Sequence, residues 1–372
     1  MLYFLINCYE PNQALTNRLL GYFYALEKQG TPTTVYFLFP NSQGSFITHK
    51  FGNVKVYYLW KKWALNSSII RLFRYHINLL RFMCRLKEGD VVYTYGINKT
   101  ALKLVSKKNI RVLAEITEHP SIIDGGKVTA ISENEKYNVA TKLDKLFVIS
   151  TSLRQLFIDE GVNPKNVEII NMTVDPQRFA AVTKQNDKER YFAYCGNASN
   201  NKDGVDKLLR SFAIVNRKYP EVKLYIFGKA PSSDISNNNL KLAEDLNIIK
   251  NVVFAGMKTA EEMPQLLTDA MALVLNRPDS QQAQYGFPTK LGEYLLTGNP
   301  VIVTKVGDIP LFLEDGVSAL LSSPDDDIEF ANKMIWVIEN NESARRIGIN
   351  GRNVAMRYFN SENEVSKILK YV

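Results

Sequence analysis

Cysteine is scarce in this chain. Its 372 residues include three cysteines, Cys8, Cys84 and Cys195, and no two of them have the CxxC spacing. Cysteines so far apart indicate neither a disulfide framework nor a thiolate metal site. We therefore expect a protein of the reducing cytosol, with no metal centre.

Long hydrophobic runs are also missing. No stretch approaches the roughly 18 uninterrupted apolar residues that a membrane-spanning helix needs. The first ten residues, MLYFLINCYE, form a short apolar run without a basic leader or a small-residue cleavage site, which predicts a strand and not a signal peptide. We expect a cytoplasmic protein, and peripheral attachment to the inner face of the cell membrane stays open.

Acidic residues are outnumbered by basic ones, 38 against 46, which gives a net charge of +8. This excess predicts an anionic partner: nucleic acid, acidic lipid or a phosphorylated small molecule. Nucleic acid ranks low, because the basic residues are spread along the chain and there is no zinc-finger or RNA-binding signature. Hydrophobic residues at 45% and charged residues at 23% are the ordinary mixture of a soluble globular protein.

Short β-rich apolar runs alternate with helical patterns, which is typical of βα units around a mostly parallel sheet. The charged segment AAVTKQNDKER, residues 180–190, has no apolar period and predicts a linker. The predicted fold is α/β with two Rossmann-like domains, residues 1–180 and 190–355, and a terminal helix, residues 356–372, that returns to the first. The expected strands lie at residues 2–7, 34–39, 54–59, 90–95, 111–117, 146–150, 167–171, 191–195, 223–227, 252–255, 272–276 and 300–304.

The run NRPDSQQAQYGFPTKLGEYLLTGNPVIVT carries the strongest chemical signal. Glycine and proline both precede and follow a helical pattern at residues 289–297, which is the punctuation of a short helix. A strand-like run lies on each side, so the helix should begin at the carboxyl edge of a parallel sheet, where ligands of such folds bind. The amides of residues 286–289, with the helix dipole behind them, predict an anion site.

Two charged residues follow in this helix. Lys290 lies in the first turn, where it opposes the helix dipole, and a nearby anion would offset that cost. Glu293 lies on the same face as Thr289, and its carboxylate suits a vicinal diol such as a ribose. The alternative is that Lys290 and Glu293 form an ordinary i,i+3 surface pair.

Two other loops point to the same edge. KVGDIP, residues 305–310, follows the next strand, and Pro310 predicts a helix start. CGNASNNKDGVD follows the first strand of the second half and contains Gly196 and Lys202. It lacks the three glycines of GxGxxG, so a nicotinamide or flavin fingerprint is absent. Lys202 is either a cation for a diphosphate or a plain surface lysine.

Together these motifs resemble those of family 4 retaining glycosyltransferases of the GT-B type. The matching stretches are YCGNASNNKDGVD, QYGFPTKLGEYLLTGNPVIVT and KVGDIPLFLEDGVSALL, and FVISTSLRQLFIDEGVNPKNVEIINMTVDPQRF precedes them. The resemblance implies two domains facing each other across a cleft, with a nucleotide-sugar donor bound by the second and the acceptor by the first. It also implies retaining sugar transfer to an acceptor hydroxyl, in bacterial polysaccharide or lipid-linked glycan synthesis.

Three positions depart from the family pattern. Tyr285 stands where the family has its first Glu, which touches the donor sugar, Asn197 replaces a diphosphate-binding Arg, and Asp308 replaces the second Gly of a pair. Glu293 matches the family's second Glu, which implies a ribose-binding role. Sugar identity is therefore open, and the lysines and helix amides are expected to bind more of the diphosphate.

The predicted catalytic residues are Lys202 and Lys290, which would stabilise the leaving diphosphate, and His119, near which the family has a His at the sugar or acceptor side. No metal or other cofactor is predicted to be required, and the acidic run at residues 325–327 predicts a helix cap. The predicted donor-binding residues are Gly196, Asn197, Tyr285, Gly286, Phe287, Pro288, Thr289 and Glu293.

The acceptor is expected at the first domain. Glu118 and His119 follow the strand-like run RVLAEIT at the carboxyl edge of its sheet; the alternative for His119 is a loop histidine held by the backbone. Asn12, Thr16 and Arg18 follow the first strand and predict contacts to acceptor phosphate or hydroxyls, although Asn12 or Thr16 could equally be a helix cap.

Residues 67–86, SSIIRLFRYHINLLRFMCRL, predict an amphipathic helix. Lys61, Lys62 and Trp63 precede it. We expect an apolar face opposite a polar stripe, which predicts either an anionic membrane anchor at residues 61–86 or a helix packed on its own sheet with a solvated Arg stripe. The apolar face is Ile69, Phe73, Ile77, Leu80 and Cys84, and the stripe is Arg71, Arg74, Asn78, Arg81 and Arg85.

Two rival functions stay open at this point. A nucleotide-sugar 2-epimerase shares the two-domain architecture but needs acid and base carboxylates beside the sugar. A non-catalytic anion- or membrane-binding protein would be consistent with the charge alone. Incubating the donor alone separates the epimerase, which converts it, from a transferase, which only hydrolyses it slowly. Thermal-shift screening against nucleoside diphosphates tests the non-catalytic alternative.

Overall fold

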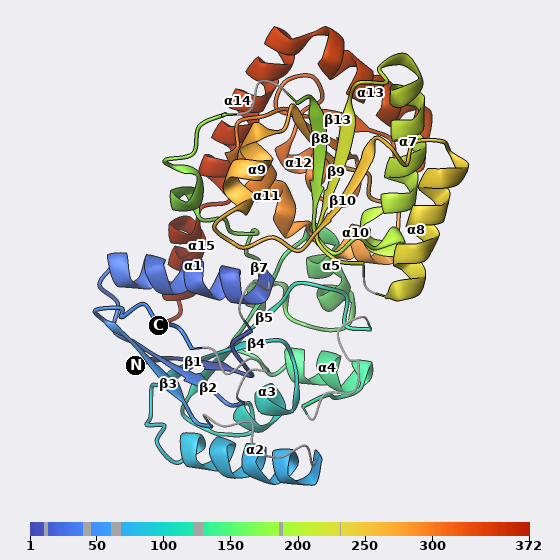
Figure 1. The fold of residues 1–372 in the computed structure, drawn as a ribbon. Coiled ribbons are helices and arrows are strands. Elements are labelled where there is room, and N and C mark those ends of the chain that lie inside the picture. Colours follow the sequence, from blue (N-terminus) through green and yellow to red (C-terminus); the bar gives the residue numbers. More distant parts are fainter. Residues whose placement is uncertain (11–13, 40–45, 61–67, 122–128, 186–188, 231) are drawn as a thin grey trace. The chain divides into compact units, whose positions relative to one another are not determined.

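The computed structural model describes residues 1–10, 14–39, 46–60, 68–121, 129–185, 189–230 and 232–372. The chain divides into two compact units (Figure 1): unit 1 is Met1–Thr173 with Ser361–Val372, and unit 2 is Val174–Asn360. Each unit contains a parallel sheet with helices, which confirms the predicted α/β class of two Rossmann-like domains. The first division falls at Thr173, ahead of the segment 180–190 that the sequence suggested as linker.

Unit 1 has seven strands in the order β3-β2-β1-β4-β5-β6-β7, all paired in parallel. They are β1 (Leu2–Ile6), β2 (Thr33–Phe37), β3 (Val54–Tyr58), β4 (Val91–Tyr95), β5 (Arg111–Ile116), β6 (Lys145–Val148) and β7 (Val167–Ile169). The helices are α1 (Ala14–Lys28), α2 (Ser68–Met83), α3 (Lys99–Leu104), α4 (Glu133–Ala140), α5 (Thr151–Asp159) and α15 (Ser361–Leu369), with a 3-10 turn η1 (Pro164–Asn166).

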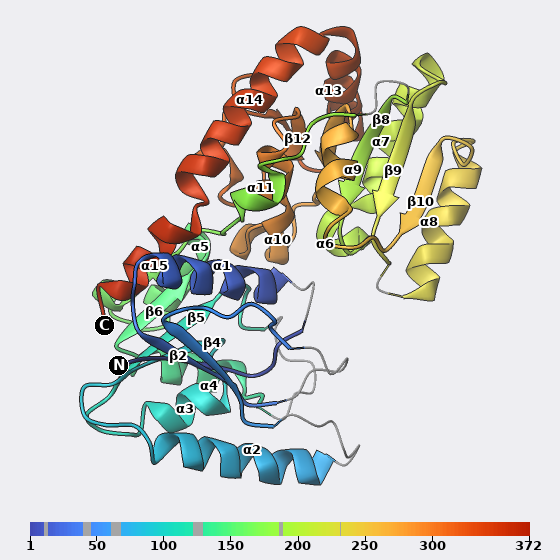
Figure 2. The same ribbon diagram turned by 60° about the vertical axis from the view of Figure 1, so that its left-hand side comes forward.

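The strand sequences of unit 1 follow from their position. In both ribbon views α1 and α15 lie on one face of the sheet and α2 and α3 on the other (Figures 1 and 2). A strand covered on both faces is apolar throughout rather than alternating, and all four residues of β6 are indeed buried. This is why short continuous apolar runs marked the strands in the sequence.

The last helix belongs to unit 1, as the sequence predicted. Helix α15 packs against α1, and its buried Glu364 accepts a hydrogen bond from the backbone amide of Asn171 at 2.7 Å. Lys28 of α1 reaches Glu362 at 2.7 Å. The chain therefore leaves unit 1 after Thr173 and returns to it at Ser361.

Unit 2 has six strands in the order β10-β9-β8-β11-β12-β13, again all parallel. They are β8 (Tyr191–Cys195), β9 (Lys223–Phe227), β10 (Val252–Gly256), β11 (Ala272–Leu275), β12 (Val301–Thr304) and β13 (Leu320–Ser322). The helices are α6 (Asn200–Asp203), α7 (Val205–Lys218), α8 (Ser233–Asp245), α9 (Met263–Asp269), α10 (Gln281–Tyr285), α11 (Thr289–Leu296), α12 (Ile309–Phe312), α13 (Asp327–Glu339) and α14 (Asn341–Tyr358), with a 3-10 turn η2 (Pro176–Phe179).

Two elements of unit 2 were not expected from the sequence. Strand β13 has only three residues, and α10 has five residues and ends shortly before α11. The expected cap at the acidic run is confirmed, because the Asp326 side chain accepts hydrogen bonds from the amides of Ile328 and Glu329 at the start of α13.

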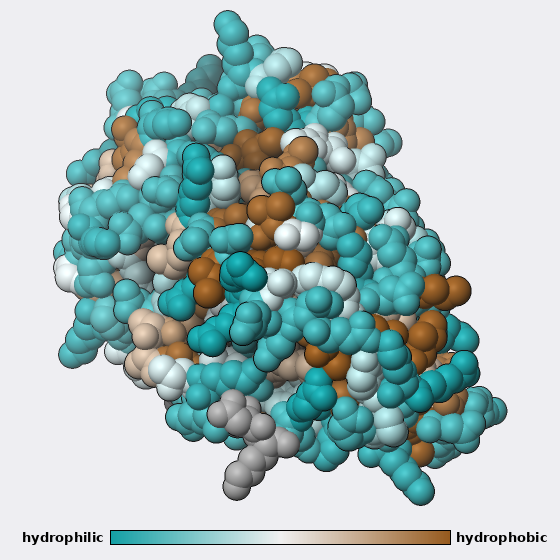
Figure 3. All heavy atoms as spheres, turned by 90° about the horizontal axis from the view of Figure 1, so that it is seen from above, coloured by the Kyte–Doolittle hydropathy of each residue, from teal (hydrophilic) through white to brown (hydrophobic). Residues whose placement is uncertain are grey.

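The described residues contain no helix both long and apolar enough to cross a bilayer. The face drawn in Figure 3 is largely hydrophilic, and its hydrophobic residues are scattered in smaller areas. Such scattered apolar surface is normal for a folded protein.

Candidate functional site in unit 2

The order of the strands locates the site. Strand β8 lies between β9 and β11, so the chain builds the sheet outward in both directions from this point. In open α/β sheets, ligands bind outside the carboxyl ends of the strands at such a switch point. The loop after β8, the loop after β11 and the start of α11 all lie at this edge.

Lys290 of α11 reaches across to the end of β8. Its Nζ lies 2.5 Å from Asp203 Oδ2 and 3.1 Å from the Tyr194 hydroxyl, and 4.8 Å from the centre of the Tyr194 ring. The Asp203 side chain is 2% exposed and the Lys290 side chain 17%. The anion that offsets the position of Lys290 in the first turn is thus an internal carboxylate, which the sequence did not indicate.

Burial lowers the pKa of Lys290, and the Asp203 carboxylate opposes that shift. The ammonium is held close to Gly196, since a Cβ on Gly196 would lie 2.3 Å from Nζ. A side chain at position 196 would have to displace the ammonium, and the φ of 150° at Gly196 also favours glycine. A poorly hydrated cation beside bare backbone is suited to receive an anionic oxygen.

Cys195 and Tyr294 join β8 to α11. The Cys195 amide donates to the Tyr294 hydroxyl at 2.6 Å, and that hydroxyl donates to the Cys195 carbonyl at 3.1 Å. Burial raises the pKa of the Cys195 thiol to about 12, with smaller effects from Glu293, Lys290 and other nearby charges. The thiol is therefore a neutral packing group, and the charged side chains of the site surround it.

Glu293 forms an ion pair with Arg178 of η2, whose other terminal nitrogen donates to the Ala260 carbonyl at 3.1 Å. The two side chains are 28% and 26% exposed. Glu293 is thus not paired with Lys290, and the structure does not show the ordinary i,i+3 surface pair.

The predicted amide site, residues 286–289, needs a correction at two positions, because Pro288 has no amide hydrogen and the Gly286 amide is already used. Gly286 is the C-cap of α10, and its amide donates to the Gln282 carbonyl at 3.1 Å. Phe287 and Pro288 are buried, and no side chain caps α11. Tyr285 ends α10 and is half-buried, and Thr289 is the first residue of α11.

The loop after β8 contains the remaining donor residues. Asn197 is exposed, and its carbonyl accepts from the Tyr194 hydroxyl at 2.8 Å. Lys202 is half-buried in α6, and its carbonyl accepts from the Arg277 guanidinium at 3.3 Å. Lys202 is adjacent in the chain to Asp203, so the loop brings both predicted lysines to the same end of β8.

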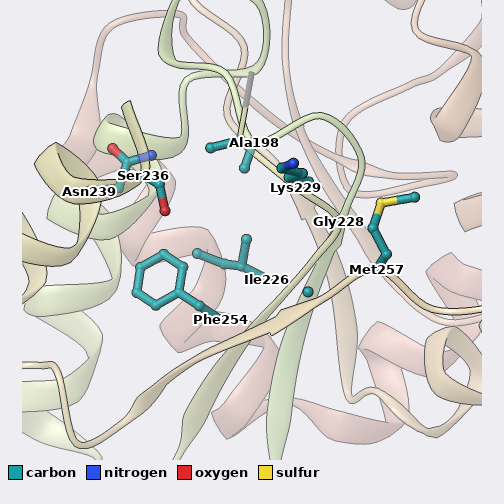
Figure 4. A pocket seen from close by; sticks show the side chains of 10 residues that line it. Ala198, Ile226, Gly228, Lys229, Ser236, Asn239, Phe254 and Met257 are labelled. Carbon is teal, nitrogen blue, oxygen red and sulfur yellow. The ribbon is translucent and has the colours of Figure 1, made fainter. Parts of the chain in front are cut away.

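A pocket of about 290 Å³ opens beside this loop, at the ends of β8, β9 and β10 (Figure 4). Ile226 and Phe254 form its apolar wall, Ser236 and Asn239 of α8 supply polar groups, and Lys229 lies at its rim. Gly228 has a φ of 112°, and a Cβ there would lie 1.9 Å from the Gly196 carbonyl. The pocket was not predicted, although the strand-glycine sequences FGKAPSSD and FAGMK mark its two loops.

Three important residues were missed by sequence reasoning. Arg277 follows β11 and is 2% exposed, and its charge also bears on the pKa of Lys290. Asp203 and Arg178 are the ionic partners of Lys290 and Glu293. The signal for Asp203 was its place next to Lys202, but nothing local distinguishes a buried aspartate from a surface one.

In unit 1 the structure places His119 and Glu118 after β5, where the sequence put them. The His119 ring is 7% exposed, its Nδ1 lies 2.7 Å from the Ser121 hydroxyl, and it accepts from the Ser121 amide at 3.2 Å. An Nδ1 that accepts from an amide leaves the proton of the neutral ring on Nε2. The Nδ1 atom of His119 is thus held by the backbone, as the alternative interpretation expected. A catalytic role for Nε2 at the sugar or acceptor side stays a prediction.

The other acceptor residues are placed differently. Arg18 is 4% exposed, and its Nε donates to Glu115 at 2.5 Å within a buried network that includes the Tyr22 hydroxyl. These contacts assign Arg18 to the core of unit 1 and give no support to acceptor binding. Thr16 is buried inside α1, where its hydroxyl accepts from the amide of Glu10 upstream at 3.3 Å, so it is not the cap of the helix. Asn12 lies outside the described residues.

Comparison with known proteins first defines the class. Anabaena HepE in complex with UDP superposes with a TM-score of 0.77 at 16% identity, covering 99% of this chain and 98% of that one. Sucrose-phosphate synthase from Thermosynechococcus elongatus gives 0.77 at 15% identity, covering 100% and 98%. The two-unit α/β fold of the whole chain is therefore that of the GT-B type.

The sequence comparison is more specific for unit 2. Residues 176–354 match the family described as "Glycosyl transferases group 1". D-inositol 3-phosphate glycosyltransferase of Mycobacterium sp. (strain KMS) is 23% identical over 232 residues, 60% of this chain and 49% of the relative. Poly(ribitol-phosphate) alpha-N-acetylglucosaminyltransferase of Staphylococcus aureus (strain COL) is 23% identical over 258 residues, 68% and 48%. The chain spans about half the length of these curated relatives.

Proposed function

We propose that this protein is a retaining glycosyltransferase of family 4 that moves a hexosyl or N-acetylhexosaminyl group from a nucleoside-diphosphate sugar to an acceptor hydroxyl. The observation that carries the proposal is Lys290, held by Asp203 and Tyr194 beside Gly196 at the switch point of the unit 2 sheet. The match of residues 176–354 to glycosyl transferases and the structures of HepE with UDP and UDP-glucose support it.

In this proposal the donor is a UDP-sugar. The nucleobase would occupy the pocket between Ile226, Phe254 and Asn239, which has both an apolar wall and polar groups. The ribose would bind at Glu293 and the diphosphate near Lys290 and Lys202. The proposed donor would thus extend along the carboxyl edge of the unit 2 sheet, from the pocket beside β9 and β10 to Lys290 and Glu293 of α11.

The chemical step needs charge stabilisation at the leaving diphosphate. The bond from the anomeric carbon to the phosphate oxygen breaks, and the bond to the acceptor oxygen forms on the same face of the sugar. The phosphate oxygen takes the acceptor proton, so no enzyme nucleophile takes part. Lys290 and Lys202 stabilise the charge that develops, and in a partly dry site such fixed charges have a larger effect than in water.

No metal is required in this proposal, because the two ammonium groups supply the positive charge. The acceptor is proposed to be a glycan or lipid-linked saccharide of bacterial surface-polysaccharide synthesis, with the bacterial relatives above as support. Unit 1 would bind this acceptor near Glu118 and His119.

The test begins with thermal unfolding of the full chain in the presence of UDP, GDP and uridine. A ligand that binds only the folded state at 100 times its Kd stabilises it by about 2.7 kcal/mol, so UDP should raise the melting temperature and uridine should do so less. UDP-glucose and UDP-N-acetylglucosamine are then incubated with and without acceptor glycans and with a chelator. Conversion of the donor sugar into its epimer without acceptor would overturn the proposal in favour of an epimerase.

A further inference from the structure

Helix α2 is packed on one side only. Tyr75, Leu79 and Phe82 are fully buried against unit 1. The apolar residues on the outer side are exposed to unusual degrees: Ile69 79%, Phe73 66% and Leu80 57%. Figure 1 shows α2 at the periphery of unit 1 with no described element over its outer side.

The sequence interpretation of this helix needs correction. If α2 were a helix packed on its own sheet, the face of Ile69, Phe73 and Leu80 was expected to contact that sheet. This face is exposed to solvent instead. Asn78, placed on the polar stripe, is 7% exposed and donates to the Leu38 carbonyl at 3.4 Å. The preceding residues 61–67 lie outside the described residues.

The exposed apolar residues form a single stripe. At about 100° per residue, positions 69, 73 and 80 fall within a narrow arc, and 77 and 84 continue it. The sixteen residues of α2 make a rod of about 24 Å at 1.5 Å per residue. A stripe of this kind has the form of an interfacial helix that lies flat on a surface.

Cations border the stripe on both sides. On one side Arg74, Arg81 and Arg85 are exposed, and Arg74 lies over the ring of the buried Trp60 at 5.0 Å. On the other side Lys103 Nζ lies 2.7 Å from His76 Nδ1, and Lys107 donates to the Met83 carbonyl. The lysines come from α3 and the segment after it, so the second border was not visible in the sequence of α2.

The two described segments that form the stripe and its borders contain no acidic residue. Neither residues 68–86 nor residues 99–108 contain Asp or Glu. A protein partner that covered the stripe would have to provide carboxylates along both borders, whereas the phosphates of an anionic bilayer provide them everywhere. The charge pattern therefore matches a lipid surface.

We propose that α2 docks flat on an anionic lipid bilayer. Ile69, Phe73 and Leu80 enter the boundary between headgroups and acyl chains, and the arginines and lysines bind lipid phosphates. This inference goes beyond the proposed function and does not depend on it, because binding needs neither donor nor acceptor.

The experiment is flotation of the full chain with phosphatidylcholine vesicles, with and without phosphatidylglycerol. The parent should float with the anionic vesicles, and higher salt should weaken this binding without abolishing it. Each basic residue near such a surface contributes about 1 kcal/mol, or about fivefold in affinity, so R74Q/R81Q/R85Q should bind roughly 100-fold more weakly. F73S/L80S should lose the binding that persists at higher salt.

A matched control keeps the test specific. R345Q/R346Q/R352Q removes the same charge from exposed positions of α14 and should bind like the parent. All substituted side chains are exposed, and unchanged thermal unfolding confirms that the variants fold. The proposal is overturned if the parent stays soluble on anionic vesicles at low salt, or if the α14 control loses binding equally. It is also overturned if F73S/L80S converts a dimer into a monomer, which would make this face a contact between two copies.

Discussion

Replacing Glu293 with Gln removes one negative charge from the middle of α11 and keeps nearly the same shape. In the free protein this carboxylate is paired with Arg178. A carboxylate has about four acceptor positions, so it can bind Arg178 and still accept from both hydroxyls of a ribose. Glu293→Gln keeps one acceptor oxygen and loses the charge.

The expected loss follows from these contacts. A hydrogen bond to a charged group contributes about 1.5–3 kcal/mol, and Gln retains part of it, so UDP binding should weaken by about 1–3 kcal/mol, or roughly 5- to 150-fold in Kd. The effect on folding should be smaller. Both side chains of the pair are about a quarter exposed, and ion pairs accessible to water contribute about 0–1 kcal/mol.

Isothermal calorimetry with UDP and with its 2′,3′-dideoxy analogue measures this directly. The analogue lacks both ribose hydroxyls, so the parent and Glu293→Gln should bind it equally. Arg178→Gln is the matched control, because it breaks the ion pair and leaves the carboxylate. An unchanged Kd for UDP in folded Glu293→Gln refutes the ribose assignment. An equal loss in Arg178→Gln would show that the pair acts only as a structural unit.

Three other predictions concern charge, the core and the backbone. Burial lowers the pKa of Lys290 from its ordinary 10.5, so the affinity for UDP should fall as pH rises through that lowered value, and binding at such a pH should be accompanied by proton uptake. Calorimetry in two buffers of different ionisation enthalpy measures this uptake, and Lys290→Met should abolish it. Between the lowered pKa and 10.5 the folded state binds fewer protons at Lys290 than the unfolded state does. The contribution of Lys290 to the free energy of unfolding therefore increases as pH rises through this range. Glu115→Leu leaves Arg18 buried and unpaired, so urea unfolding should show a loss of about 3–5 kcal/mol that the added change Arg18→Met largely restores; a stable single variant would contradict this. Gly228→Ala places a Cβ 1.9 Å from a backbone carbonyl, whereas Gly89, also at positive φ, has nothing within 4 Å; Gly228→Ala should therefore cost more than the roughly 1 kcal/mol expected for Gly89→Ala, and equal urea midpoints would count against the close approach.

Local pattern was sufficient for most of the elements, with β13 and α10 as exceptions. The run VVYTY predicted β4, and the Gly and Pro residues around residues 289–297 predicted α11 to within one residue of its observed end. Both signals arise between residues close in the chain, through side-chain alternation, fixed φ and helix termini. The approximate division into two α/β units followed from the same alternation.

The partners of the charges required the tertiary structure. Lys290 pairs with Asp203, 87 residues away, and Glu293 with Arg178, 115 residues away. The sequence placed Lys290 and Glu293 correctly on a helix at the carboxyl edge of the sheet. It does not reveal whether a charged side chain contacts a ligand, another side chain or water. Arg18 on α1 shows the same limit, because its partner Glu115 lies on β5, which β4 separates from β1 in the sheet.

Helix α2 separates the two levels most clearly. Its sequence predicted one apolar face with a stripe of arginines opposite it. Which side packs on the sheet was decided only by tertiary structure, since Tyr75, Leu79 and Phe82 fill the interior of unit 1. A helix with two apolar sides buries the one whose shapes fit the sheet at close-packed density. That choice depends on residues from distant strands, and it leaves Ile69, Phe73 and Leu80 at the surface.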